Sequence, residues 1–206
     1  MEFITHSHRH GMTLFENEEP FRSLWQEIAA AVGGISDDEL ADRFEAQIHE
    51  SKSISAVLNA MLKERFGAAG WAAESPIFAD EGYMAGDGGR YRLDFAKDVV
   101  SVEVAFNHGE AAAWNLLKPV MASELNHVRK AIQTEAGVII TATDAMKAAG
   151  GFDSAVGSFE KYVQYLRPLN DVLSVPLVVI GLLPPSSFEI VHISDGRRKL
   201  GRVRRP

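Results

Sequence analysis

The sequence predicts a single α/β domain, over residues 1–206, with a mixed central sheet flanked by helices. Apolar residues recur at helical spacing in the first third of the chain, and short runs rich in valine and isoleucine follow later. Helical segments separate those later runs, which is the pattern of a sheet built with crossover connections. A length of 206 residues suits one domain with one sizeable core.

Three helices are predicted before the first strand. Pro20 opens the first of them, because proline is favoured at the start of a helix and apolar residues follow it at helical spacing. Ser36 with Glu39 three residues later is a capping-box pattern, and we expect the second helix to run to about Glu50. The third helix is expected over roughly residues 53–70.

Strands alternate with helices in the rest of the chain. Residues 71–89 contain four glycines and are predicted to form a flexible loop. Two strands joined by a turn at Lys97 and Asp98 follow, and then a long helix over about 111–134, which Pro119 should kink or break. The remaining predicted elements are a buried strand over 137–143, a helix over 159–166, a buried strand over 175–183 and an edge strand over 188–193.

The composition excludes several classes of protein. There is no cysteine, so neither a disulfide framework nor a thiolate metal site is available. No apolar run reaches the ~20 residues that cross a bilayer, and no signal-peptide pattern opens the chain. We therefore expect a cytoplasmic protein.

Both ends of the chain carry unusual residues. The net charge is −7, yet residues 197–206 hold six of the 21 basic residues. A basic C-terminal tail on an acidic body suits contacts to nucleic-acid phosphates, and a solvated terminus is an equal alternative. At the other end His6, His8 and His10 alternate, and we expect them to lie on a mobile terminus rather than in a metal site.

The two strands of the predicted hairpin over residues 91–108 each carry one acidic residue, Asp94 on the first and Glu103 on the second. By the period-two rule, the face of the second strand that carries Glu103 also carries Ser101, Ala105 and Asn107, and we expect it to be polar. Asp94 approaches Glu103 if the strands pair. Two close carboxylates repel each other unless a cation lies between them, and oxygen ligands suit Mg²⁺ or Mn²⁺. Spacing alone leaves open that both acids are solvated residues.

The segment "RLDFAKDVVSVEVAFNHGEAAAWNLLKPV" resembles the active-site segment of the BglII-type restriction endonucleases, which belong to the PD-(D/E)xK nuclease class. The shared pattern is an Asp in LDF(A/V)KD, an eight-residue gap and a Glu in E-V-x-(F/W). The likeness extends upstream through "SKSISAVLNAMLKERFGAAGW" and downstream to "GVIIT". The resemblance implies a restriction-endonuclease-like fold and a Mg²⁺-dependent type II enzyme, a homodimer that cleaves double-stranded DNA at a short palindrome centred on GATC.

The resemblance also implies the roles of individual residues. Asp94 and Glu103 match the acids that bind the metal, and the carbonyl of Val104 matches a main-chain ligand. The family's next position, usually Gln, Glu or Lys, corresponds to Ala105, which can neither orient a water nor stabilise charge. We expect a polar side chain at this position to lie beside the metal, and Asn107 to substitute for it in part.

Other polar residues are candidates for weaker roles, and each also fits an ordinary solvated charge. The candidate DNA contacts are His108, Lys118, Arg197 and Arg198, with Arg129 and Lys130 on the long predicted helix. The candidate auxiliary acids are Glu50, Asp80, Glu81 and Asp87.

The alanine at position 105 leaves a second hypothesis open. A DNA-binding protein on the nuclease fold that has lost catalysis would also carry this departure and this acidic body. A third alternative is that Ala105 was introduced to trap a complex, and a fourth is an α/β protein unrelated to DNA.

Overall fold

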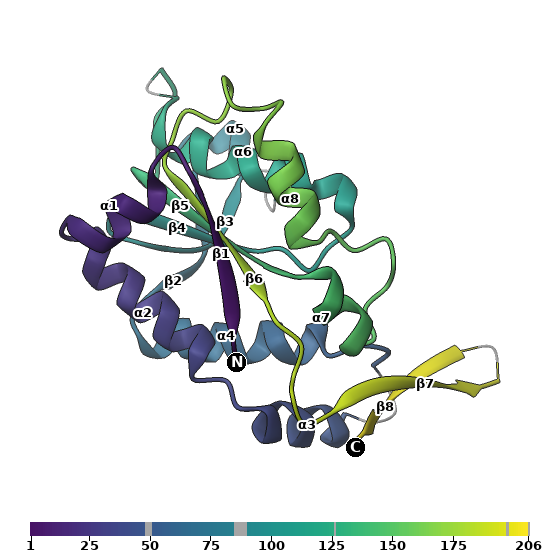
Figure 1. Ribbon diagram of the computed structural model, residues 1–206. Helices are drawn as coiled ribbons and strands as arrows, with labels where there is room; N and C mark the ends of the chain where they lie inside the picture. Colours follow the sequence, from purple (N-terminus) through teal and green to yellow (C-terminus); the bar gives the residue numbers. More distant parts are fainter. Residues whose placement is uncertain (48–50, 85–89, 126, 197, 206) are drawn as a thin grey trace.

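A six-stranded mixed sheet forms the centre of the computed structural model, which describes residues 1–47, 51–84, 90–125, 127–196 and 198–205 (Figure 1). In sheet order the strands are β1 (Phe3–His8), β6 (Leu177–Leu182), β5 (Ala136–Ala142), β4 (Val100–Val104), β3 (Arg92–Lys97) and β2 (Ala72–Pro76). Strands β4, β5 and β6 are parallel, and the other pairs are antiparallel. The predicted mixed α/β architecture is confirmed.

Helices cover both faces of this sheet (Figure 1). The helices that share the larger core with one face are α1 (Gly11–Asn17), α2 (Phe21–Gly33), α3 (Asp37–Ala46), α4 (Ser55–Ala68) and α7 (Asp144–Ala149). The other face packs on α6 (Ala112–Ser123) and α8 (Phe159–Leu166). Two short helical turns complete this part of the fold, α5 (Glu81–Met84) and η1 (Gly109–Ala111).

Several predicted elements are confirmed because local chemistry specifies them. Helix α2 begins directly after Pro20, and the Ser36 hydroxyl caps α3 by accepting a hydrogen bond from the Glu39 N–H at 3.1 Å. Strands β3 and β4 form a hairpin around Lys97 and Asp98, with Phe95 opposite Val102. Helix α3 ends at Ala46, earlier than predicted, and residues 48–50 lie outside the described part of the chain.

The predicted long helix over 111–134 is half as long as expected. Helix α6 passes through Pro119 and ends at Ser123. Side chains from the following loop satisfy carbonyl groups of its last turn, because Lys130 donates to the Ala122 carbonyl at 3.0 Å and Gln133 donates to the Ser123 carbonyl at 2.6 Å. Lys130, like the neighbouring Arg129, therefore lies in a loop and not on a helix.

The N-terminus is ordered, contrary to the prediction. Strand β1 pairs with β6 along its whole length and forms one edge of the sheet. His8 is buried, and its Nε2 lies 2.8 Å from the Leu173 carbonyl. His6 and His8 therefore share the inward side of an edge strand, while His10 follows the strand and is exposed at the start of α1.

The C-terminal basic segment is also built into the fold. β7 (Glu189–Asp195) and β8 (Arg198–Arg204) form a separate two-stranded sheet, so the predicted edge strand is not an edge of the central sheet. A Cβ at Gly201 would lie 2.6 Å from the Lys52 carbonyl, which shows how closely this hairpin packs on the segment before α4. Arg205 lies near Asp42 and Glu45 of α3, so acids offset part of the basic charge.

The predicted loop over 71–89 contains β2 and α5, while residues 85–89 are outside the described segments. None of the helices in the described residues has the length and apolar character that a membrane span requires.

Candidate active site

The β3–β4 hairpin brings Asp94 and Glu103 side by side. Phe95 pairs with Val102, which places the two acids opposite each other one step further along the strands. The Asp94 N–H donates to Glu103 Oε1 at 3.4 Å, and the Val104 N–H donates to Asp94 Oδ2 at 2.7 Å. The backbone of the hairpin therefore holds both carboxylates in one place.

Burial makes this pair of acids costly in the absence of a cation. Glu103 is only 1% exposed, and burial together with the charge of Asp94 raises its pKa to about 8 against the opposing effect of Lys118. Burial also raises the pKa of Asp94, and Glu74 raises it further, while Lys118 and the Val104 N–H lower it. Two such groups hold their charge together only when positive charge lies beside them.

Lys118 supplies one positive charge to this pair. Its Nζ lies 2.5 Å from Glu103 Oε2, and its side chain is 10% exposed. The prediction that Lys118 contacts DNA does not fit this geometry, because its ammonium group is directed into the protein. Lys118 lies on α6, and α6 covers the face of β4 that carries Glu103.

Ala105 is not on an open polar face. It is 0% exposed and packs in the smaller core with Ala112, Leu116 and Ile139. The prediction of a polar strand face is therefore wrong, because α6 and α8 cover it. For the same reason, the expectation that a polar side chain at position 105 would lie beside the metal without rearrangement is not supported.

Asn107 lies beyond the end of β4 and is exposed. Its side-chain oxygen accepts from Asn115 Nδ2 at 3.2 Å, and the same nitrogen donates to the Tyr162 hydroxyl at 2.7 Å. Its neighbour His108 is also exposed and forms an isolated β-bridge with Val156. Both residues are thus at the protein surface next to the end of the strand that carries Glu103.

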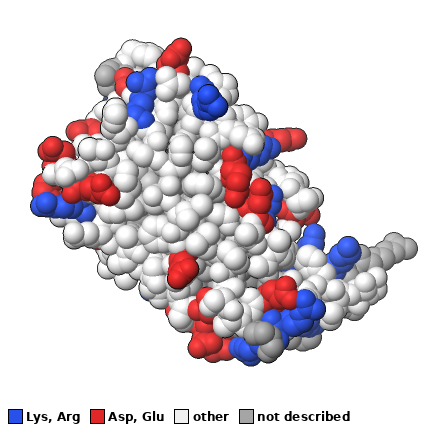
Figure 2. Space-filling view, in the orientation of Figure 1, with Lys and Arg blue, Asp and Glu red and all other residues white. Residues whose placement is uncertain are grey.

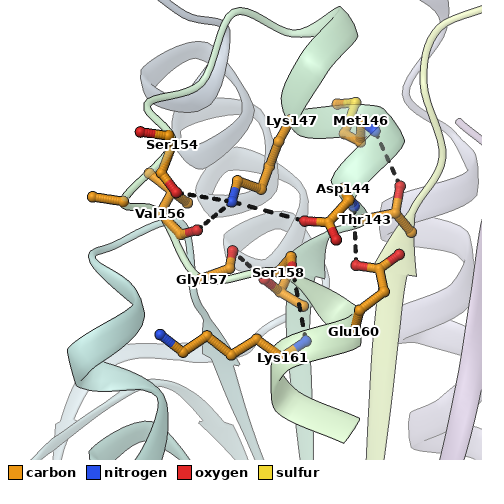
Figure 3. A network of polar contacts seen from close by, with 12 residues as sticks. Thr143, Asp144, Met146, Lys147, Ser154, Val156, Gly157, Ser158, Glu160 and Lys161 are labelled. Carbon is orange, nitrogen blue, oxygen red and sulfur yellow. Dashed lines mark hydrogen bonds and ion pairs between the residues drawn. The ribbon is translucent and has the colours of Figure 1, made fainter. Parts of the chain in front are cut away.

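Asn107 and His108 contact the loop over residues 154–158. A network of polar contacts holds this loop in place (Figure 3). Lys147 on α7 donates to the Val156 carbonyl at 2.6 Å, and the Gly157 N–H donates to the Asn107 carbonyl at 3.0 Å. Figure 3 shows the Lys147 side chain reaching across to this loop. The N-termini of α7 and α8 are also capped. The Thr143 hydroxyl accepts a hydrogen bond from the Met146 N–H, and the Ser158 hydroxyl accepts one from the Lys161 N–H.

A cleft of about 260 Å³ opens beside Asp94. Its lining residues are Asn59, Lys63, Ala73, Glu74, Asp94, Phe95 and Val104.

Sequence reasoning missed Glu74, which lies in the segment predicted to be a loop. The ladder pairs on either side, Ala73 with Phe95 and Ser75 with Leu93, place Glu74 across from Asp94. Glu74 has a φ of 52°, a left-handed conformation that is uncommon for residues other than glycine.

The other predicted residues lie apart from this pair. Arg198 is the first residue of β8. Asp80 is exposed and directly precedes α5, whose first residue is Glu81. Arg197, Glu50 and Asp87 lie outside the described residues.

The donor groups at the site fit a hard divalent cation. Among the described residues, no cluster of three or more His, Cys, Asp and Glu residues could enclose a metal ion. Two carboxylates and a main-chain carbonyl leave the remaining positions to water and substrate oxygens, which is the way Mg²⁺ is usually bound. Burial and, for Glu103, the charge of Asp94 raise the pKa values of the two acids when no cation lies between them, and a bound cation would favour the charged form of both.

Comparison with known proteins identifies similar proteins with this fold. A family model described as restriction endonuclease BglII/BglIII matches residues 3–182. The crystal structure of restriction endonuclease BGLII complexed with a DNA 16-mer is similar, with 17% sequence identity and a TM-score of 0.66 over 99% of this chain and 89% of that chain. The crystal structure of free BglII is also similar, with 17% identity and a TM-score of 0.57 over 100% of both chains. No curated protein matches the sequence.

Proposed function

We propose, from the premise that this chain belongs to the BglII/BglIII restriction endonuclease family, that it cleaves double-stranded DNA at a short palindrome with the help of Mg²⁺. Family membership makes the chain a type II restriction endonuclease, which is a DNA hydrolase. The observation that carries the metal-dependent mechanism is the meeting of Asp94 and Glu103 on the β3–β4 hairpin, beside an open cleft.

Each group at the site has a defined task in this proposal. Asp94, Glu103 and the carbonyl of Val104 would hold Mg²⁺, whose chemistry is to activate a water and to offset charge that develops on the phosphate. The Val104 N–H holds Asp94 Oδ2, so that the carboxylate keeps its direction. The cleft beside Asp94 supplies room for the phosphate that is attacked.

The resemblance supports the proposed substrate and assembly state. One solved neighbour is a complex with a DNA 16-mer, which supports duplex DNA as the partner of this chain. A palindrome has two-fold symmetry, so a single small domain reads it most simply as a two-fold homodimer. The resemblance favours a site centred on GATC.

Cleavage of supercoiled plasmid DNA tests the proposal. We expect linear products with Mg²⁺ or Mn²⁺ and intact plasmid with EDTA, and sequencing of the product ends should give a palindrome containing GATC. Sedimentation equilibrium should give twice the mass of the chain. An absence of cutting on every DNA with either metal would count against metal-dependent cleavage, and a monomer would exclude the dimer.

The second candidate function is DNA binding without efficient cleavage. It is favoured by Ala105, which is buried in the smaller core and offers no polar group to a water. A gel shift with Ca²⁺ in place of Mg²⁺ separates the two candidates. A protein that shifts a GATC-containing duplex but never cuts it with Mg²⁺ has lost catalysis.

The β7–β8 hairpin is the proposed contact to DNA phosphates. Figure 2 shows basic side chains gathered on this hairpin, with acidic side chains beside them. Because Leu200 is buried in the hairpin, deletion of residues 197–206 would remove a strand and not only charge. A substitution at the exposed Lys199 is therefore the better test.

We expect Lys199→Glu to weaken DNA binding and to reduce the slope of log affinity against log salt by about 0.9, the value for one lost phosphate contact. Fluorescence anisotropy with Ca²⁺ over a range of salt concentrations measures the slope. Arg22→Glu on α2, also an exposed charge reversal, is the control. Equal slopes for both variants would show that Lys199 of the hairpin makes no contact with DNA phosphates.

A further inference from the structure

Lys118 is the nearest cationic side chain to the acid pair, and it comes from a different element. It lies on α6, 15 positions after Glu103, and its Nζ contacts Glu103 Oε2 at 2.5 Å. The side chain is nine-tenths buried, so this lysine is surrounded by protein on nearly every side. A buried lysine is retained only where a specific partner holds it.

The two oxygens of Glu103 have different partners. Oε2 is held by Lys118, while Oε1 accepts from the Asp94 N–H at 3.4 Å and is thus directed toward the strand of the second acid. Asp94 is fixed from the other side, since its Oδ2 accepts from the Val104 N–H. The contact with Lys118 therefore selects the orientation of Glu103 in which one oxygen remains on the side of Asp94.

No side chain on β4 itself supplies this contact. Position 105, two residues after Glu103 on the same face, is an alanine enclosed by Ala112 and Leu116 of α6. Helix α6 thus packs closely on the strand at position 105 through Ala112 and Leu116, and two residues after Leu116 it presents Lys118 to Glu103. The polar group that the strand lacks comes from the helix that covers it.

We propose that Lys118 is a positioning residue for the metal site, which holds Glu103 Oε2 so that Oε1 is directed toward Asp94 and the two acids can share one cation. This inference rests on the proposed metal-dependent function. Outer partners of carboxylate ligands fix the orientation of the ligand, and their loss typically reduces metal affinity ~10–100-fold. A different role is conceivable for the same contact: if Lys118 were only a counter-ion that the metal displaces, its removal would strengthen metal binding.

Isothermal titration of the DNA-free protein with Mn²⁺ distinguishes these roles by the sign of the effect. We expect Lys118→Met to raise the Kd for Mn²⁺ by ~10–100-fold and Lys118→Arg, which keeps the charge and the donors, to recover most of the affinity. Circular dichroism confirms that each variant is folded. Should Lys118→Met fail to fold, Lys118→Gln serves instead, because it keeps a buried donor that falls short of Oε2 by ~1.5 Å, about one bond length.

The matched control is Lys97→Met. Lys97 is on β3, three residues after Asp94, and its Nζ contacts both oxygens of Glu27 at 2.8 Å. This variant loses a well-paired lysine of the same hairpin whose partners, Glu27 and the Ala69 carbonyl, are not part of the acid pair, and we expect its Kd for Mn²⁺ to match that of the wild type. An unchanged or lower Kd in Lys118→Met overturns the positioning role. A wild-type protein that takes up no Mn²⁺ and also cuts no plasmid DNA with Mg²⁺ or Mn²⁺ would instead contradict the metal-dependent function itself.

Discussion

Replacing Glu103 by glutamine should reduce DNA cleavage by at least ~10³-fold, because the neutral amide is a poor ligand for Mg²⁺ and the metal supplies several kcal/mol of transition-state stabilisation. Glutamine is the appropriate replacement because Glu103 is buried and contacts Lys118. Alanine would leave that lysine buried without a partner, at a cost of about 3–5 kcal/mol. With an alanine variant, a loss of cleavage would therefore not distinguish unfolding of the protein from removal of the metal ligand.

The measurement is the initial rate of supercoiled plasmid cleavage at saturating Mg²⁺, with the folded state checked by thermal denaturation. Glu16→Gln, at an exposed position of α1, is the control and should cut at the wild-type rate. If Glu103→Gln also cuts at the wild-type rate, the assignment of Glu103 to the metal is wrong.

Ala105→Gln should destabilise the protein and should not accelerate cleavage. Ala105 is enclosed by Ala112, Leu116 and Ile139, so a longer side chain must displace α6 or α8. We expect a loss of about 2–4 kcal/mol in the free energy of unfolding, from overpacking and from an amide buried without a full set of hydrogen bonds.

Urea denaturation monitored by circular dichroism measures this free energy. Ala30→Gln, at an exposed position of α2, makes the same change in solvent and should alter the free energy of unfolding by less than about 0.5 kcal/mol. A folded Ala105→Gln variant that is as stable as the wild type and cuts faster would show that a side chain at position 105 does reach the acid pair.

The alternation of side chains along β4 was predictable, but the environment of each face was not. The period-two rule correctly places Glu103 and Ala105 on one face. Because Glu103 and Ser101 are polar, this face seemed exposed. Its character is set by the neighbouring strands, which contribute Ile139 and Val179 to the same core. No local pattern in residues 91–108 carries that information.

The ends of the helices were likewise predictable only where the residues that determine them are close in the sequence. The start of α3 was predictable because its cap, Ser36, is adjacent in sequence. The end of α6 was not, because the side chains that satisfy its last carbonyls, Lys130 and Gln133, come from the loop beyond it. The contact of Lys118 with Glu103 also depends on how α6 packs, and a single sequence gives no sign of it.

The position of β1 has a consequence for biosynthesis. Ile4 pairs with Gly181, so β1 leaves the ribosome before the other strands of this sheet and must wait for a partner that is made 177 positions later. At ~5–20 residues per second, this delay is roughly 10–35 s. During that time β1 has no partner strand. Even if β4 and β5 have already paired, the edge of β5 that later pairs with β6 is still open. The pairing of β1 with β6 closes the longest loop between neighbouring strands of the sheet, and we expect the slow step of folding to be sensitive to changes in β1.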